Sequence, residues 1–254
     1  MSLPLVAVDI GNTMVKFGVV EPSVVRGIPG FARIVEFRTA EFDSDFLSDL
    51  LPAEPHAWRV ASVHRPAERR LAAWVAGSRP GDDYRLLGHQ DLPIVMDVEF
   101  PDRVGMDRLV AAVAANHLRD AKHPAIVVDA GTAITVDAVN ASGAFLGGVI
   151  LPGFRMTAHA MAHDTDLLPV ADATFPDAPP SVIGKSTVAA IRSGIFWGGV
   201  GAVRELVTRI GNELDGEPQL FVTGGDAELL IRFVHRDARF FPELALAGIV
   251  WAVR

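Results

Sequence analysis

The sequence predicts an α/β protein built from two related lobes. Short apolar runs rich in β-branched residues, typical of buried strands, alternate with segments whose apolar residues recur at helical spacing. The strand-turn-strand plan of Leu5–Val20 returns near the middle of the chain, at Ala125–Val139. Such a repeat indicates a duplicated domain. We therefore expect one lobe over residues 1–118 and a second over residues 119–254.

The composition narrows the class of protein. Half of the 254 residues are hydrophobic, enough for a sizeable core, and the formal net charge of −8 argues against a nucleic-acid or membrane surface. Without cysteine the chain has no disulfide, thiolate metal site or cysteine nucleophile. No signal-like segment precedes Asp9, and no stretch reaches the roughly 18 uncharged apolar residues of a membrane helix. We expect a cytoplasmic protein.

The first hairpin joins the expected strands Leu3–Ile10 and Met14–Val20. Its turn, Gly11-Asn12-Thr13, offers backbone N–H groups and short polar side chains, which together form an anion-binding concavity. Lys16 would add a positive charge beside it; the alternative is a strand lysine that faces water.

The remainder of the first lobe alternates strands and helices. A loop with two prolines and two glycines is expected at Glu21–Ala32. The order β-β-β-α-β-α is typical of a ribonuclease-H-like lobe. It rests on four further segments: strands Ile34–Arg38 and Ala57–Val63, and helices Phe42–Leu51 and Ala67–Ala76.

A helix is expected to begin beside Gly105, Asp107 and Arg108. Aspartate in a first helical turn is favoured by the helix dipole, so capping alone would account for Asp107. Arg108 is different, because a cation there opposes the dipole. Its position indicates a paired or ligand-facing role.

The central hairpin carries a carboxylate and hydroxyls at its corner. Asp129 ends the apolar run Ala125–Val128, Gly131 is expected to permit the turn, and Thr132 and Thr135 follow. These groups suit a metal ion or a phosphate chain, whereas an ordinary hairpin with a polar tip is the simpler alternative. The recurrence of the plan at Asp9 favours a functional site, because two facing lobes would bring both acidic corners to one cleft.

The second lobe ends in two glycine-rich features. The segment after Ser186 and Thr187 is expected to be a helix, capped by one of these hydroxyls. We expect its apolar residues to form a twofold interface, because one lobe is not expected to bury them all: Ile191, Ile195, Phe196 and Trp197. Strand Leu220–Gly225 ends in a glycine turn that a purine could approach closely, although a simple strand-to-helix connection is equally consistent.

These stretches, taken in chain order, resemble the motifs of type III pantothenate kinases, members of the actin, sugar-kinase and Hsp70 superfamily. Asp9-Ile-Gly-Asn-Thr-Met-Val-Lys16 matches DxGNTxxK, Gly105-Met-Asp-Arg108 matches GxDR, and Asp129-Ala-Gly-Thr-Ala-Ile-Thr135 matches DxGTAxT. The remaining matches follow in the family's order: Gly147-Gly148, Leu151-Pro-Gly153, Gly184-Lys-Ser-Thr187 and Thr223-Gly-Gly225.

The resemblance implies a duplicated actin-like ATPase fold, with two ribonuclease-H-like lobes and ATP in the cleft between them. It implies ATP-dependent phosphorylation of pantothenate to 4'-phosphopantothenate, the first step toward coenzyme A. It also implies Mg²⁺ with ATP, a monovalent cation (K⁺ or NH₄⁺), and a homodimer with pantothenate near the subunit interface.

The resemblance also assigns roles by motif position. Asp107 would be the general base, and Asp129 would bind the monovalent cation. The implied ATP-binding residues are Asp9, Gly11, Asn12, Thr13, Lys16 and Thr132. The implied pantothenate-binding residues are Gly105, Arg108 and Thr187.

Two departures from the family pattern keep alternatives open. Family members often carry a tyrosine before GxDR, but Val95–Phe100 has none and the only tyrosine is Tyr84. Family members also often have arginine where Asp164 precedes Thr165. Two alternative functions therefore remain: a superfamily kinase for another small alcohol, and a non-catalytic regulator on the same fold.

Overall fold

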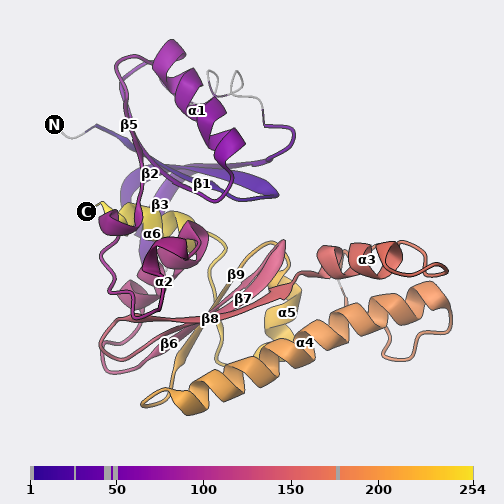
Figure 1. Ribbon diagram of the computed structural model, residues 1–254. Helices are drawn as coiled ribbons and strands as arrows, with labels where there is room; N and C mark the ends of the chain where they lie inside the picture. Colours follow the sequence, from indigo (N-terminus) through magenta and orange to yellow (C-terminus); the bar gives the residue numbers. More distant parts are fainter. Residues whose placement is uncertain (1–2, 26, 43–46, 48–50, 176–177, 254) are drawn as a thin grey trace. The chain divides into compact units, whose positions relative to one another are not determined.

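The computed structural model describes residues 3–25, 27–42, 47, 51–175 and 178–253. By packing, the chain divides into two compact units (Figure 1). Unit 1 comprises Met1–Ile94, Glu99–Leu118 and Glu243–Arg254, and unit 2 comprises Val95–Val98 and Arg119–Pro242. The last segment of the chain, expected in the second lobe, thus packs with the first. Among the described residues, none of the helices combines the length and apolar character needed to span a bilayer.

Unit 1 contains a five-stranded sheet with the order β3-β2-β1-β4-β5. Strand β1 (Leu5–Ile10) pairs antiparallel with β2 (Met14–Val25), which pairs antiparallel with β3 (Ile28–Arg38). On its other side β1 runs parallel to β4 (Ala57–Ser62), and β4 runs parallel to β5 (Asp83–Leu86). The carboxyl ends of β1 and β4 therefore meet at one edge of the sheet.

The prediction of a loop at Glu21–Ala32 is wrong, because β2 and β3 extend into this segment as a two-stranded ribbon. A register shift between Val20 and Val24 accommodates the proline at position 22. Gly27, with φ of +85°, lies at the reversal. Since β3 is an edge strand of the described sheet, its own proline removes no essential ladder bond.

Within the described residues, three α-helices accompany this sheet. Helix α1 (Arg65–Ser78) is capped by His64, whose Nδ1 accepts from Ala67 N–H at 3.2 Å. Helices α2 (Met106–Leu118) and α6 (Leu244–Ala252) pack closely enough that a Cβ on Gly248 would lie 1.8 Å from Val110 O. Short 3-10 turns occupy His89–Asp91 and Pro101–Arg103. The helix expected over Phe42–Leu51 falls mostly outside the described residues.

A buried polar network ties β4 to the turn before β5. Asp82 accepts from Arg79 Nε at 2.5 Å, from Trp58 Nε1 at 2.7 Å and from the backbone N–H of His56 at 3.0 Å. Burial by itself would raise the pKa of Asp82, but the hydrogen bonds from Arg79, Trp58 and His56 outweigh it and lower that pKa below 3.8. Asp82 therefore stays ionised inside unit 1.

Unit 2 repeats the sheet topology of unit 1, with the order β10-β9-β6-β7-β8. Strands β6 (Ala125–Ala130), β7 (Ala133–Val139) and β8 (Phe145–Pro152) form the antiparallel part. Strands β9 (Gln219–Thr223) and β10 (Arg239–Phe240) run parallel to β6. Three strands of an antiparallel meander followed by two parallel strands occur in both units, which confirms the duplicated α/β plan.

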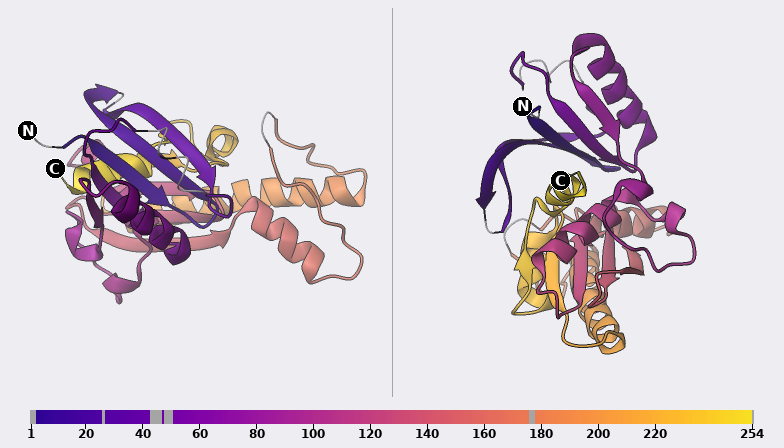
Figure 2. Two further views of the ribbon diagram at one scale, coloured as in Figure 1. Left: turned by 90° about the horizontal axis from the view of Figure 1, so that it is seen from above. Right: turned by 90° about the vertical axis from the view of Figure 1, so that its left-hand side faces the viewer.

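The helices of unit 2 are α3 (Phe154–His163), α4 (Thr187–Glu213) and α5 (Ala227–Val234). Helix α3 and the first part of α4 lie side by side and project beyond the sheet of this unit (Figure 2). The expectation that one lobe would not bury all four apolar side chains of α4 holds only for Trp197, which is partly buried. Ile191, Ile195 and Phe196 are at most 6% exposed within unit 2 itself.

Candidate active site

The β1/β2 turn gathers the expected phosphate-binding residues of unit 1. Asp9 stands near the end of β1, directly opposite Lys16 of β2. The N–H of Gly11 donates to Met14 O at 2.9 Å and closes a tight turn. A Cβ on Gly11 would lie 3.1 Å from that same oxygen, so the turn favours glycine there. The hairpin holds the full expected set: Asp9, Gly11, Asn12, Thr13 and Lys16.

Thr39 fixes this turn, and the sequence alone does not identify it. Its Oγ1 donates to Gly11 O at 2.9 Å and its backbone N–H donates to Thr13 O at 2.8 Å. Thr39 is 1% exposed, and its own carbonyl accepts from Arg70 Nη2 of α1 at 3.1 Å. A threonine just beyond β3 therefore positions a turn that lies 28 residues earlier in the chain.

Lys16 forms an ion pair with Glu36 on β3, with Nζ and Oε1 3.0 Å apart. Their side chains are 21% and 44% exposed, so water screens the pair. Exposed pairs of this kind contribute only about 0–1 kcal/mol. Lys16 can therefore exchange Glu36 for a phosphate at little cost.

The start of α2 presents the carboxylate of Asp107. Its Oδ1 accepts from the N–H of Arg108 at 2.8 Å, within the first turn of the helix. A Cβ on Gly105 would lie 2.5 Å from that oxygen, so a larger residue before the helix would displace the Asp107 carboxylate from its present position. Asp107 and Arg108 are both partly buried.

Val63 connects the start of α2 to the β1/β2 turn. Its N–H donates to Ile10 O at 3.0 Å, immediately before Gly11. Its Cγ1 would lie 3.8 Å from a Cβ on Gly105. The structure of unit 1 thus brings Gly105, at the start of α2, close to the β1/β2 turn.

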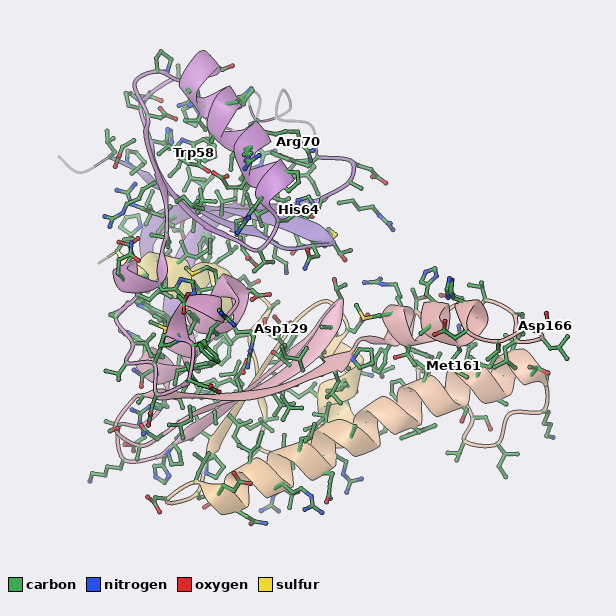
Figure 3. The ribbon with its side chains drawn as sticks, viewed as in Figure 1. Trp58, His64, Arg70, Asp129, Met161 and Asp166 are labelled. Carbon is green, nitrogen blue, oxygen red and sulfur yellow. The ribbon has the colours of Figure 1, made fainter. Side chains whose placement is uncertain are left out.

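In unit 2, Asp129 occupies the place on β6 that Asp9 occupies on β1 (Figure 3). Its partner across the hairpin is Thr135, whereas the partner of Asp9 is Lys16. On its other side Asp129 pairs with Thr223 of β9. The aspartate at this backbone position therefore faces a lysine ammonium group in unit 1 and a threonine hydroxyl in unit 2.

Two glycines crowd the Asp129 corner. A Cβ on Gly224 would lie 2.4 Å from Asp129 Oδ1, and Gly224 has φ of +102°. A Cβ on Gly153 would lie 2.4 Å from Thr132 O, which accepts from the N–H of Gly153 at 3.1 Å. The expectation that a side chain at position 131 would obstruct the turn is wrong. An added Cβ there would come no nearer than 3.7 Å to another group, an ordinary contact.

Thr135 Oγ1 is buried and has no hydrogen-bond partner within the described part of the chain. Cross-strand partners place their Cβ atoms about 4.5–5.5 Å apart, so this hydroxyl faces the same side of the sheet as Asp129. Leaving such a hydroxyl unpaired costs about 1–3 kcal/mol. The corner thus holds a carboxylate and a buried oxygen that can accept a ligand.

A pocket of about 460 Å³ lies beside the glycine turn after β9. Phe154, Phe175 and Phe196 line one part of it, and Gly225 and Asp226 line another. The rings of Phe154 and Phe175 are 5.5 Å apart, and those of Phe175 and Phe196 are 5.1 Å apart. The turn is predictable from the sequence, but these rings are not, because they come from three separate segments.

Asp226 brings a carboxyl group to this pocket. Burial is the largest influence and raises the pKa of Asp226 above 3.8, while the charge of Arg155 opposes that rise. Its backbone N–H donates to Ala130 O at 2.9 Å, which links the pocket to the Asp129 corner. An aromatic pocket with one polar end suits a flat ligand that bears hydrogen-bonding groups.

Thr187 lies apart from the Asp129 corner. It is the first residue of α4, at the end that projects beyond the sheet of unit 2 (Figure 2). Ser186 is the N-cap, since its Oγ accepts from Ala189 N–H at 3.2 Å, so the hydroxyl of Thr187 is not needed for capping. Thr187 is exposed.

Comparisons with known proteins agree with this arrangement. The family model for type III pantothenate kinase matches residues 5–209. The type III pantothenate kinase of Akkermansia muciniphila is 33% identical over 243 residues, 95% of each chain. That of Rhodopirellula baltica is 43% identical over 180 residues, which span 68% of this chain and 62% of that relative.

A solved structure matches in fold. The inorganic polyphosphate/ATP-glucomannokinase of Arthrobacter sp. strain KM superposes with a TM-score of 0.50 at 16% identity, covering 99% of this chain and 98% of that one. The likeness supports the actin-like kinase fold that two sheets of the same topology indicate. Because the family model matches most of the chain and a relative matches over 95% of its length, the chain belongs to the type III pantothenate kinase family.

Proposed function

We propose that the protein transfers the γ-phosphoryl group of ATP to the terminal hydroxyl of pantothenate, the first step toward coenzyme A. One observation carries the proposal. Gly105, two residues before the carboxylate of Asp107, lies close to Val63, whose N–H bonds to Ile10 O next to the Gly11 turn, a turn that can hold phosphates. A base beside a phosphate-binding turn is the minimum that alcohol phosphorylation requires.

The reaction balances with these groups. The hydroxyl oxygen of pantothenate bonds to the γ-phosphorus as the bond from that phosphorus to the β-phosphate oxygen breaks. ADP leaves with the electron pair of the broken bond, and the hydroxyl proton passes to a carboxylate oxygen of Asp107. Phosphoryl transfer depends mainly on position and charge, so the main task of the chain is to hold the two substrates in line.

The residues of unit 1 take complementary roles. The N–H groups of the turn and the ammonium of Lys16 would bind the phosphates, with Asn12 and Thr13 adding polar contacts at the tip. Arg108 would bind the carboxylate of pantothenate, for which a guanidinium fork is well matched. Gly105 would let the acceptor approach the first turn of α2.

The Asp129 corner fits a monovalent cation. A hard cation favours oxygen ligands, and the unpartnered Oγ1 of Thr135 beside Asp129 supplies one that is otherwise unexplained. The described residues contain no group of three or more histidine or acidic side chains suited to a metal. Mg²⁺ would instead accompany ATP, as it commonly does when phosphates provide most of its ligands. Bound at the corner, K⁺ or NH₄⁺ would offset phosphate charge, and Thr132 would contact ATP.

The pocket beside Gly225 fits the base of ATP. A purine could stack on the phenylalanine rings, and Asp226 could pair with its polar edge. Added Cβ atoms on Gly225 would meet no described atom within 4 Å, so the turn leaves room for a ligand.

We also propose that the protein is a homodimer. Gly194, Gly198 and Gly201 lie on an exposed side of α4, and added Cβ atoms there would meet no described atom within 4 Å, which permits close approach of a second helix. Exposed apolar side chains occur on the same projecting part: Leu167, Val182 and Ile183. Thr187 stands on this part too, so in a dimer it could reach pantothenate near the interface. The cytoplasm, where ATP is available, is the proposed location.

The experiment that tests the function is a coupled assay of ADP release. Pantothenate would be compared with a panel of small primary alcohols of similar size, since Val95–Phe100 and Asp164 differ from the common family residues. Pantothenate should give the highest kcat/KM. A higher value for another alcohol would assign a different acceptor, and no turnover with any acceptor, despite ATP binding, would favour the non-catalytic regulator.

A further inference from the structure

The segment Asp172–Phe175 forms part of the wall of the pocket beside Gly225, and a single side chain of α4 holds it in place. Nη1 of Arg192 donates to Asp172 O, and Nη2 donates to Thr174 O at 3.1 Å. The guanidinium also lies over the ring of Phe175, 4.9 Å from its centroid. Arg192 thus contacts two backbone carbonyls of the segment and the aromatic ring at its end.

The segment is also closed on itself. Asp172 Oδ1 accepts from the N–H of Thr174 at 2.9 Å and from its Oγ1 at 2.7 Å. The hydrogen bond from the Thr174 hydroxyl, then that from its N–H, lower the pKa of Asp172. Arg192 adds an ion pair, with Nη1 and Asp172 Oδ2 3.6 Å apart. These interactions give the backbone a defined turn that carries Phe175.

Arg192 acts on the pocket from outside. It does not line the pocket of Phe154, Phe175 and Phe196, but a neighbouring one of about 400 Å³ beside the start of α4. Its influence on a ligand in the first pocket therefore passes through the two lining residues that it contacts, Thr174 and Phe175. That ring is only partly buried by its neighbours, so without the arginine it would have alternatives to its present position.

We propose that Arg192 is a positioning residue that fixes Phe175 as a stacking surface for the nucleotide base, and so sets the affinity for purine nucleotides without touching them. The proposal rests on the proposed function, in which the base of ATP occupies this pocket. A lysine at position 192 would keep the charge but not the planar fork that spans two carbonyls. Arg192→Lys should therefore weaken nucleotide binding while leaving the fold intact.

The test compares Arg192→Lys and Phe175→Leu with the parent by equilibrium titration of 2-aminopurine riboside triphosphate, whose fluorescence falls on stacking. Base–aromatic stacking is typically worth about 1–3 kcal/mol, a factor of roughly 5–150 in Kd. Both variants should lose at least 5-fold in affinity and much of the quench. The double variant should lose little more than either single one, because both changes remove the same stacking surface.

Two controls separate positioning from general damage. Inorganic tripolyphosphate has no base, so its affinity should be the same in the parent and both variants. Arg204→Lys, at an exposed position of the same helix, should bind the nucleotide like the parent. In steady state, KM for ATP should rise in Arg192→Lys with kcat within about 3-fold.

The outcomes distinguish the two proposals. Equal nucleotide affinity in Arg192→Lys and the parent overturns the role of Arg192, and so does an equal loss for tripolyphosphate. If Arg192→Lys binds nucleotide more weakly but the parent phosphorylates no alcohol, the proposed kinase reaction fails while the positioning role stands. If the parent does not quench the probe at all, the pocket is not a base site and this inference is wrong, whatever the activity assay shows.

Discussion

Asp129 on β6 and Thr135 on β7 are direct partners across the hairpin, and the Thr135 hydroxyl is buried without a hydrogen-bond partner among the described residues. We expect Thr135→Val to keep or raise the melting temperature in sodium buffer, because it removes an unpaired buried hydroxyl. A ligand that binds only the folded state raises the melting temperature. The rise that K⁺ causes in the parent should be lost in Thr135→Val and kept in Thr135→Ser.

Asp129→Asn should weaken the same response along with activity, since it removes the charge that attracts the cation. The measurement is a thermal melt in sodium and in potassium buffer, beside turnover in each. A potassium response of equal size in Thr135→Val would exclude this hydroxyl as a ligand. Equal rates of the parent in the two buffers would remove the monovalent-cation assignment.

Asp107→Asn should lower turnover by about 10²–10⁴, the usual effect of losing a general base. Asparagine keeps an oxygen that can accept from the N–H of Arg108, so the free energy of unfolding should fall by no more than roughly 1 kcal/mol, mainly through the helix dipole. ATP affinity should change little. Turnover within a few-fold of the parent would reduce Asp107 to a structural residue of the first turn of α2.

Thr39→Val should loosen the β1/β2 turn by removing the hydrogen bond to Gly11 O. The expected cost is about 1–3 kcal/mol of stability, because a buried carbonyl loses its partner, together with a several-fold rise in KM for ATP. Thr208→Val is the matched control, since its hydroxyl bonds to Arg204 O on an exposed helix face. Urea denaturation and steady-state kinetics give both quantities, and parallel behaviour of the two variants would contradict the role of Thr39.

Stability should depend on pH through Asp82. Its hydrogen bonds hold the pKa below 3.8 in the folded state, so the unfolded state binds more protons in this range. The stability that Asp82 contributes is complete above its unfolded pKa of about 3.9 and is lost as the pH falls through the folded value. Asp82→Asn should lower the free energy of unfolding by about 1–3 kcal/mol at pH 7, because hydrogen-bond donors that the carboxylate satisfies lose part of their pairing. The cost should shrink toward pH 3, as followed by urea melts across the range.

Gly198→Arg should convert a dimer to a monomer without unfolding it, because position 198 is exposed and arginine favours helix over glycine. Light scattering at micromolar concentration measures the change, and Glu213→Arg, at the exposed last residue of the same helix, is the control. A parent that is already monomeric under these conditions would contradict the homodimer.

Much of the fold follows from local sequence signals. Strands β1 and β6 were predictable because each is a short apolar run ending in aspartate, and Ser186 marks the start of α4 by the chemistry of its hydroxyl. The β2/β3 ribbon was not predictable, since its prolines and glycines have the composition of a loop. Its strand character comes from pairing at the edge of the described sheet.

The candidate site likewise contains residues that local sequence predicts and residues that it does not. Its turn residues lie close together in sequence, so Asp9 and Lys16 could be placed on one hairpin from spacing alone. Thr39 and the phenylalanine pocket depend on contacts between distant segments, which a single sequence does not reveal. The burial of Phe196 was misjudged for the same reason, because the rings that cover it, such as Phe175 and Phe233, belong to other elements.

Lys16 and Thr135 occupy the same register position in two units that share one sheet topology. The first half carries an ammonium attached to its own backbone opposite the aspartate, while the second half presents a hydroxyl there. An attached charge is present whatever the surroundings, whereas a charge taken from solution varies with the ions that the cell accumulates. By this proposal, the difference at one residue would make the enzyme responsive to the salt composition of its host.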